Sequence, residues 1–396
     1  MPIKSFIGVV RGTGGKMNAG GGSVPVSGIN PNWTVGSGGD FADLSTALAS
    51  PSVVNGHYIK VLPGTYTISS LLDINKEVYI GGTPGSKGDV VFETAGAGGD
   101  PVSMIKVSAN NVVLKDLTIK HKKTTNTSVE AAVTLTNTVG GVNVRVDNFI
   151  MDSCRIEHVE FGLVMRGNSF KVANCEVAYV GPNNTTRRHV GLYGTGGTCF
   201  FTNNVFEDST AGGVTGNTNI FYLTTTTGLV VSERFNGTLV VDGSTWVSST
   251  SKQPNQFFNQ DNCQSDSSFS LMFKNNVMNE KNLFVGLYGS TTNFGDVFGD
   301  ITLYNNTLSN IHQVSPAYGK GMLSITGGGS NITWRSTNLT AHISGNTLTN
   351  STYRADYSAV SGADIGRQTA AIASFSANVD ATIPATPTAP STPNLL

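Results

Sequence analysis

Residues 149–156 read FIMDSCRI and residues 170–177 read FKVANCEV, and the two stretches share one pattern. In each, the first and third residues are apolar, the fifth is small and polar, and the eighth is again apolar. Alternating apolar residues place one face of a strand against a core. Because Asn, Asp and Gly tolerate the left-handed backbone that a sharp bend needs, the pattern predicts a strand, a bend and a second strand.

The same pattern recurs along the chain at irregular intervals. Its eight instances are Val112-Leu114-Asp116-Ile119, Phe149-Met151-Ser153-Ile156, Phe170-Val172-Asn174-Val177, Cys199-Phe201-Asn203-Phe206, Leu239-Val241-Gly243-Trp246, Leu271-Phe273-Asn275-Met278, Ile301-Leu303-Asn305-Leu308 and Ala341-Ile343-Gly345-Leu348. Repeats such as ankyrin hold their length, whereas a β-helix coil keeps its cross-section and lets its loops vary. The sequence therefore predicts an all-β, single-stranded right-handed parallel β-helix. Ten or so coils at about 4.8 Å each would form a rod on the order of 50 Å long.

Four of the bend positions are asparagines, namely Asn174, Asn203, Asn275 and Asn305. Stacked coils would bring these amides together, so we predict a ladder in which each amide bonds its neighbour along the axis. Replacing Asn203 or Asn275 by Leu should then lower stability by about 1–3 kcal/mol. The residues that follow the bends form a second column: Leu117, Cys154, Cys175, Asn204, Ser244, Asn276, Asn306 and Asn346.

The chain divides into three segments by composition. Residues 1–30 are rich in glycine and read as a flexible arm, and residues 31–350 hold the predicted β-helix. Residues 351–396 end in a proline-rich tail that favours extended backbone.

A short amphipathic helix is predicted at the start of the β-helix, where residues 33–48 read WTVGSGGDFADLSTAL. Asp40 is the expected N-cap and Asp43 would lie in the first turn. Phe41, Leu44 and Leu48 would share one face and cap the open end of the stack.

Composition excludes several classes of protein. The net charge is −1 and only 13% of residues are charged, so a nucleic-acid surface is not expected. No apolar run is long enough to span a membrane, and the stretch from Phe6 to Val10 is too short for a secretory signal. We therefore expect a protein that folds in the cytoplasm.

The four cysteines, Cys154, Cys175, Cys199 and Cys263, have two readings. Disulfides are one, but buried thiols are the interpretation we favour for a chain folded in the cytoplasm. Their spacing predicts no metal site, and no motif predicts a cofactor.

The stretch TVGSGGDFADLSTAL, followed by YIKVLPGTYTISSLLDINKEVYIGG, resembles the opening of pectinesterase-type domains in the pectate-lyase-like superfamily. That superfamily includes polysaccharide lyases and the trimeric tailspikes and other appendages of bacteriophages. The resemblance implies the β-helix fold over about residues 33–350. It carries over no catalytic residue, because the pectinesterase site motifs are absent and the nearest Gln-Asp match, in residues 259–262, is a coincidence.

Glycoside hydrolysis needs two carboxyl groups about 5–10 Å apart, which adjacent coils can supply. Glu157, Glu176, Glu207 and Asp208 follow consecutive bends and are the candidate catalytic residues. The alternative, which we favour, is a solvated face that keeps the rod soluble.

Other residues are weaker candidates for binding. Arg187, Arg188 and His189 could bind an acidic sugar, although a solvated loop is the simpler interpretation. Trp246 occupies an inward position, whereas Trp334, Tyr193, Tyr222 and Tyr288 could stack on sugars.

These observations favour a virion structural protein, such as a phage tailspike, fibre or capsid decoration protein, assembled in the host cytoplasm. The resemblance implies a homotrimer that attaches to the host surface and binds bacterial surface polysaccharide. Arg11 and Lys16 in the arm could anchor it to other virion proteins. The alternative is a polysaccharide-degrading enzyme, either a lyase or a glycoside hydrolase, on the same scaffold.

Overall fold

The structure is a computed structural model. It describes residues 8–10, 17–21, 30–96, 100–101, 103–122, 131–139, 142–158, 160–180, 186–208, 217–224, 235–248, 255–261, 270–279, 283–289, 299–309, 321–327, 339–349 and 355–358.

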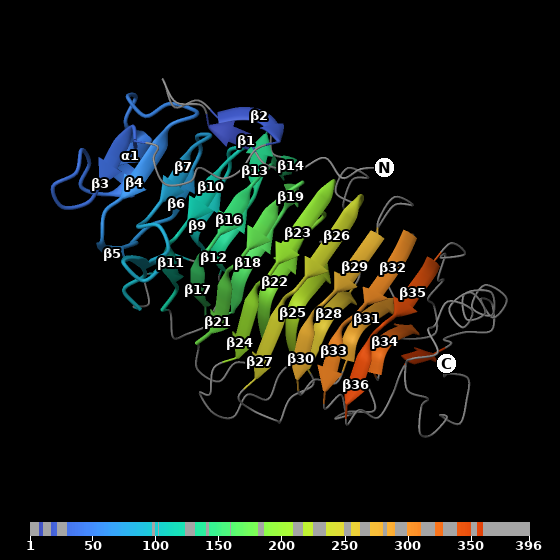
Figure 1. Cartoon of the computed structure of the whole chain (residues 1–396). Coiled ribbons are helices and arrows are strands. Elements are labelled where there is room, and N and C mark those ends of the chain that lie inside the picture. The colour runs from blue at the N-terminus through green and yellow to red at the C-terminus, as the bar shows by residue number, and fades with distance from the viewer. Residues whose placement is uncertain are drawn as a thin grey trace.

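Three long parallel sheets make up the fold (Figure 1). The first sheet contains, in spatial order, β3 (Trp33–Val35), β4 (Tyr58–Val61), β7 (Tyr79–Gly81), β10 (Val113–Lys115), β16 (Ile150–Asp152), β20 (Lys171–Ala173), β23 (Thr198–Thr202), β26 (Thr238–Asp242), β29 (Ser270–Lys274), β32 (Gly299–Tyr304) and β35 (Leu339–Ser344). The second sheet contains β5 (Gly64–Thr67), β8 (Val90–Glu93), β11 (Thr118–Lys120), β17 (Arg155–His158), β21 (Glu176–Tyr179), β24 (Val205–Asp208), β27 (Thr245–Ser248), β30 (Val277–Asn279), β33 (Thr307–Ser309) and β36 (Thr347–Thr349). The third sheet contains β6 (Leu72–Ile74), β9 (Ser103–Val107), β12 (Ala131–Leu135), β18 (Phe161–Met165), β22 (Thr186–Leu192), β25 (Asn217–Thr224), β28 (Asn255–Asp261), β31 (Leu283–Gly289), β34 (Gly321–Gly327) and β37 (Ala355–Ser358).

Each coil of the chain gives one strand to each sheet. The chain runs from the first sheet to the second and then the third, and the next coil pairs with it in parallel. Ile150 thus pairs with Val113 of the previous coil and with Lys171 of the next. The predicted parallel β-helix is therefore confirmed, and it continues to β37, past residue 350.

Small elements decorate the stack. β13 (Asn137–Val139) and β14 (Val142–Val144) form an antiparallel hairpin, while β15 (Val146–Asp147) pairs in parallel with β19 (Gly167–Asn168). The glycine-rich arm contains a second antiparallel pair, β1 (Gly8–Val10) with β2 (Met17–Gly21). Arg11 and Lys16, the predicted anchor residues, lie outside the described residues.

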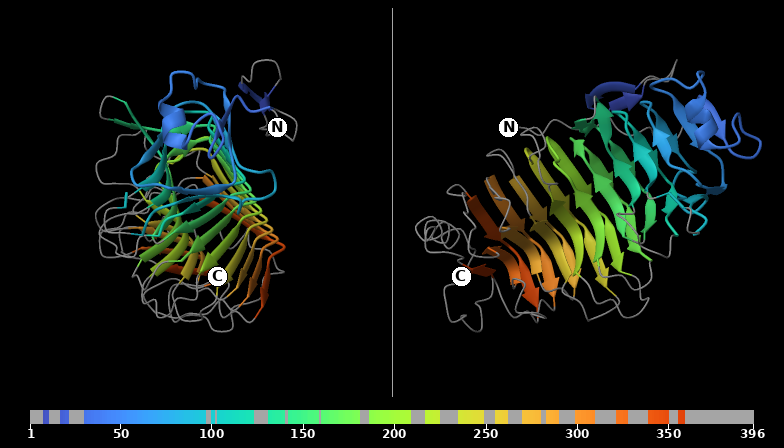
Figure 2. Two further views of the ribbon diagram at one scale, coloured as in Figure 1. Left: turned by 90° about the vertical axis from the view of Figure 1, so that its left-hand side faces the viewer. Right: turned by 180° about the vertical axis from the view of Figure 1, so that it is seen from behind.

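The predicted helix is present as α1 (Leu44–Ala49), but it begins later than expected. Its N-cap is Asp43, whose side chain accepts a hydrogen bond from the Thr46 amide at 2.7 Å. Asp40 instead accepts from the amide and hydroxyl of Thr34, both at 2.8 Å. The N-cap prediction was wrong because Asp40 is used to close the turn before the helix. Leu44 and Leu48 are buried in the core, and α1 lies at the N-terminal end of the stack (Figure 2).

The bend that follows each of the eight strands from β10 to β35 of the first sheet has the predicted left-handed backbone. Its φ angle lies between 53° and 65° at Asp116, Ser153, Asn174, Asn203, Gly243, Asn275, Asn305 and Gly345. A second set of left-handed residues precedes strands of the same sheet: Asn111, Asn148, Ser169, Gly197 and Gly237. At Gly237 a Cβ atom would lie 2.0 Å from the Gly197 carbonyl oxygen, so only glycine fits there.

A buried amide ladder lies one residue after the bends. Asn276 and Asn306 donate through Nδ2 to Oδ1 of the next asparagine, at 3.0 Å to Asn306 and 2.8 Å to Asn346. The main-chain amides of Ser244, Asn276 and Asn306 also donate to the Oδ1 atom of the next coil, at 2.8–3.0 Å. These side chains are at most 3% exposed, so each amide is held almost wholly by protein partners.

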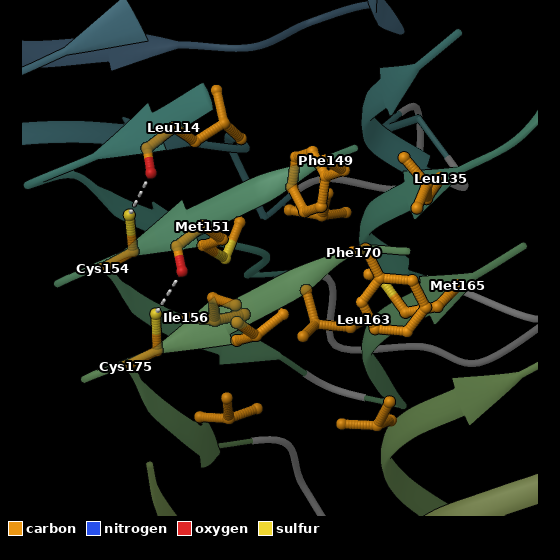
Figure 3. Packing of buried hydrophobic residues seen from close by; sticks show 14 of the residues in the cluster. Leu114, Leu135, Phe149, Met151, Cys154, Ile156, Leu163, Met165, Phe170 and Cys175 are labelled. Atoms are coloured by element: carbon orange, nitrogen blue, oxygen red, sulfur yellow. Dashed lines mark hydrogen bonds between the residues drawn. The ribbon is translucent and has the colours of Figure 1, made fainter. Parts of the chain in front are cut away.

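Cysteines fill the same column in earlier coils. The Sγ atoms of Cys154 and Cys175 face the carbonyl oxygens of Leu114 and Met151 at 3.7 and 3.8 Å (Figure 3). The Nδ2 atoms of Asn204, Asn276, Asn306 and Asn346 bond the equivalent carbonyls at 2.7–3.1 Å. Cys154, Cys175 and Cys199 are free, buried thiols, as predicted, whereas Cys263 lies outside the described residues. Burial raises the pKa of the Cys154 thiol, so it stays protonated.

The bend asparagines themselves form a more broken series on the surface. Asn305 donates to Asn275 at 2.8 Å, and Asn275 donates to Asp242 of the previous coil at 2.8 Å. Asn174 donates to Asp152 at 2.8 Å, but Gly243, which follows Asn203 in this column, has no side chain. The continuous ladder therefore lies one position later than we expected, because the residue after the bend points into the core.

Candidate functional site

Three of the predicted carboxylates lie on one face of the second sheet. Glu157 lies in β17, Glu176 in β21 and Glu207 in β24. In the strand register, Glu176 pairs with Arg155, whereas Glu157 and Glu207 both pair with Ala178, one from each side. The intervening residues Ile156, Val177 and Phe206 are buried in the core. The carboxylates therefore point outward, as the strand alternation predicts.

Arg155 connects these carboxylates. Its guanidinium lies 2.9 Å from Glu157, 2.6 Å from Glu176 and 3.7 Å from Glu207. Lys120 lies 3.0 Å from Glu157, and Lys87 forms an ion pair with Glu176. We call these six residues the Arg155 network. Its charges are +3 and −3, so the network is neutral.

The electrostatics of the network do not suit proton donation. Burial raises the pKa of Glu157, but hydrogen bonds from Arg155 and Lys120 outweigh it and hold the pKa below its usual value. For Glu176 the opposing hydrogen bonds come from Lys87 and Arg155, and the pKa is again lowered. A general acid needs a raised pKa, so neither carboxyl group fits that role.

The other predicted residues do not join this face. The side chain of Asp208 lies outside the described part, although its backbone pairs with Tyr179. His189 is buried, with Nε2 2.9 Å from the Glu207 carbonyl oxygen and its ring 5.0 Å from the Trp246 ring. Arg188 stacks 3.5 Å from the centre of the Tyr222 ring.

None of the remaining candidates for stacking on sugars has a fully exposed ring among the described residues. Trp246 is 2% exposed and belongs to the core, and Tyr222 is 8% exposed beneath Arg188. Tyr193 is partly buried. Trp334 and the side chains of Tyr288 and Arg187 lie outside the described residues.

The structure brings together a second cluster that sequence reasoning missed. Tyr58 and Tyr79 lie on neighbouring strands of the first sheet with ring centres 4.5 Å apart. In the next coils Lys115 pairs with Asp152, both in register and through an ion pair. Asp116 follows Lys115 at the bend and accepts a hydrogen bond from the Gly85 amide at 3.1 Å. We call these five residues the tyrosine–aspartate cluster.

The pKa values of the two carboxyl groups of this cluster are shifted in opposite directions. Burial raises the pKa of Asp116, which is 3% exposed, and the nearby Asp152 adds to the effect. Burial also raises the pKa of Asp152, but hydrogen bonds from Lys115 and Asn174 outweigh it and lower the pKa.

A largely apolar column lies on the outward side of the first sheet beside this cluster; its members Tyr79, Val113 and Val240 are at most 7% exposed, and the others are partly exposed. Successive strands place Tyr58, Tyr79, Val113, Ile150, Lys171, Phe200 and Val240 in register. Lys60 lies two residues from Tyr58 on the same strand face. Among the residues that the structure describes, Lys60 and Lys171 take part in no ion pair. We call this set the first-sheet platform.

A register argument from sequence could have found part of the cluster. The repeat pattern places Lys115 and Asp152 at the same position of consecutive coils, immediately before the bend. Tyr58 and Tyr79 precede the first instance of the pattern, so their coils could not be aligned with the rest.

The described residues contain no group of three or more His, Cys, Asp or Glu that could hold a metal ion. The described part of the chain also has no helix long and apolar enough to cross a membrane.

Comparison with known proteins shows likeness in structure rather than sequence. No protein-family model and no curated protein sequence matches the chain. Pectin methylesterase from carrot is 13% identical, with a TM-score of 0.51 over 81% of this chain and 91% of the carrot chain. Pectin methylesterase from Aspergillus niger is 14% identical, with a TM-score of 0.49 over 72% of this chain and 88% of that one. Pectate lyase Pel9A is 14% identical, with a TM-score of 0.46 and coverage of 77% and 74%.

At such low identity the likeness establishes the fold and not the reaction. The chain thus has the right-handed parallel β-helix fold that the carrot pectin methylesterase also has.

Proposed function

We propose that this protein acts on polysaccharides and binds an acidic glycan chain along the first-sheet platform. The observation that carries the proposal is the nearness of the partly exposed members Tyr58, Ile150 and Phe200 of this column to Lys60 and Lys171, which take part in no ion pair among the described residues. Aromatic rings stack on sugar rings, and unpaired lysines attract carboxylate groups. Four coils separate Lys60 from Lys171, which is about 19 Å along the axis and suits an extended polymer.

The Arg155 network does not favour the same role. Each carboxylate in it faces a cation of the chain itself, so the network offers no net charge to a ligand. The likeness to pectin methylesterases is consistent with a glycan ligand, but the platform residues are what support one here.

Affinity electrophoresis through gels that contain a polyuronate or a neutral glucan tests binding. The native chain should be retarded by the polyuronate, and Lys60→Gln with Lys171→Gln should abolish most of the retardation. Lys106→Gln is the matched control, because it removes one charge from an ion pair with Asp73 on the third sheet. Equal mobility with and without polyuronate would overturn the proposal.

A second candidate function is glycoside hydrolysis by the tyrosine–aspartate cluster. Asp116, with its raised pKa, would donate a proton, and Asp152 would act as the ionised partner. Contact between Asp116 and a substrate requires the segment around Gly85 to move, because that segment covers the carboxyl group.

Release of reducing ends from the bound glycan tests this second candidate. Asp116→Asn and Asp152→Asn should each abolish release while leaving retardation in the gel unchanged. Binding without any release of reducing ends would reject hydrolysis and leave the binding proposal intact.

The virion role, the homotrimer and the host-surface attachment stay predictions from sequence. They are compatible with a glycan-binding rod, and particle fractionation with an antibody to the chain would test them.

A further inference from the structure

The outward face of the second sheet changes character along the stack. From β8 to β24 it carries Glu93, Lys120, Arg155, Glu157, Glu176 and Glu207. The four strands β27, β30, β33 and β36 read TWVS, VMN, TLS and TLT and hold no charged residue. The outward positions that the structure describes in those four strands are Thr245, Val247, Val277, Asn279, Thr307, Ser309 and Thr347, which we call the neutral face.

Apolar side chains on the neutral face are open to solvent. Val247 is 50% exposed and Val277 is 44% exposed, whereas the intervening Trp246 and Met278 are buried. Tyr304, at the end of β32 beside the same bend, is 50% exposed. Three of the six large exposed hydrophobic side chains among the described residues therefore lie in consecutive coils, two on the neutral face and Tyr304 on the first sheet across the bend, and gathered apolar side chains mark interaction surfaces.

We infer that the neutral face packs against the same face of a second copy of this chain. Two properties of the face select this occupant. A partner that brings a charge would bury it unpaired, whereas a second copy brings none over these four strands. The side chains also recur once per coil, at about 4.8 Å, and a second copy has the same repeat over the same length.

The symmetry and the size of the contact follow from this occupant. A face that meets itself is related by a two-fold axis, which closes a dimer rather than the homotrimer expected from the sequence resemblance. The two sheets would pack face to face about 10 Å apart, with valines of one copy between the ridges of the other. Four coils span only about 14–19 Å, less than a standard interface needs, so association should depend on concentration.

Sedimentation velocity on the full chain over a range of concentrations tests the inference. The native chain should shift from monomer to dimer as concentration rises. Val277→Lys places like charges in the contact and should weaken association by at least about tenfold. Val54→Lys is the matched control, because Val54 is 49% exposed in a turn far from the neutral face and should leave association unchanged.

A second variant protects the test against misfolding. Val247→Thr with Val277→Thr keeps β-branched side chains and adds no charge, so it should fold and still weaken the dimer. A native chain that stays monomeric at every concentration would overturn the inference, as would unchanged association in both variants. Binding of a neutral glucan that Val277→Lys abolishes in a monomeric chain would assign the face to glycan instead.

Discussion

The two halves of the stack connect their coils by different means. Between β8 and β24 the polar contacts lie outside, in the Arg155 network, and the column behind the bends holds Leu117, Cys154 and Cys175. From β27 onward the outer face of the second sheet is neutral, and a buried ladder runs from Ser244 to Asn346. The outer polar contacts of this half lie on the first sheet and its bends, where Lys274 pairs with Asp242 and Asn305 donates to Asn275. The transition occurs at Asn204, whose Oδ1 accepts the Cys175 amide at 2.9 Å.

The difference shows that the same coil geometry can hold either a thiol or an amide at the interior position after the bend. A thiol and an amide occupy the same interior position and face the equivalent carbonyl oxygen, at 3.7–3.8 Å for the thiols and 3.0 Å for the amides. Buried amide bonds between neutral groups do not depend on salt or pH, whereas partly exposed ion pairs do. The two halves should therefore respond differently to mutation and to solvent.

The largest expected effect is in the buried ladder. Asn306→Leu should lower the free energy of unfolding by about 2–4 kcal/mol, because the buried Asn276 amide and the Phe273 carbonyl oxygen lose their partners. Urea denaturation followed by circular dichroism measures the change. A loss below about 0.5 kcal/mol would show that the ladder is not stabilising.

The next effect is in the Arg155 network. Arg155→Met should cost about 1–2 kcal/mol, since Glu157 and Glu176 would face each other without their shared cation. The same denaturation measurement at low salt checks it, with Lys60→Met as a control for loss of a cation that takes part in no ion pair among the described residues. An equal loss in both variants would contradict the assignment.

The contribution of this network should also depend on pH. Both glutamates have a lowered pKa in the folded protein, so the folded state binds fewer protons and the contribution is complete above the unfolded value of about 4.3. The difference in stability between native chain and Arg155→Met should be constant from about pH 5 to 8 and shrink below about pH 4. A difference that persists unchanged to pH 3 would be inconsistent with ion pairing.

A smaller effect should follow from extending the ladder. Cys175→Asn places an amide where the thiol faces the Met151 carbonyl oxygen, so stability should change by less than about 1 kcal/mol. Cys175→Asp is the contrasting variant, because it would bury a charge and should be strongly destabilising. Thermal melts at pH 7 distinguish the two, and equal melting points would reject the shared role of thiol and amide.

The smallest effect is expected at the exposed bend. Asn305→Gly keeps the left-handed backbone and removes only a surface hydrogen bond to Asn275, so stability should change by about 0.5 kcal/mol or less. A loss as large as that of Asn306→Leu would restore the bend asparagines as the main ladder.

Much of the fold could be predicted from the sequence, because the pattern at residues 149–156 and its repeats encodes an inward face and a left-handed bend. The position of the ladder could not be predicted, since it depends on which side of the bend enters the core. Asn305 and Asn306 are neighbours in the sequence, yet the Asn305 side chain is exposed whereas that of Asn306 is only 1% exposed.

The candidate site was predicted only in part. The repeat pattern correctly placed Glu157, Glu176 and Glu207 on one face. It could not predict their ion pairs with Arg155, Lys87 and Lys120, because these depend on how far each side chain extends. Lys87 lies in a segment between β7 and β8 and pairs with Glu176 three strands along the second sheet, a contact that no repeat pattern reports. The tyrosine–aspartate cluster was missed because Tyr58 and Tyr79 come before the aligned repeats.

Hydrogen exchange measured by mass spectrometry on two variants tests the account most directly. Arg155→Met should speed exchange in the strands from β8 to β24 and leave β29 to β35 unchanged, because coils interact mainly with their neighbours. Asn306→Leu should do the reverse. If both variants speed exchange equally along the whole stack, the two halves are not held by separate networks and the account is contradicted.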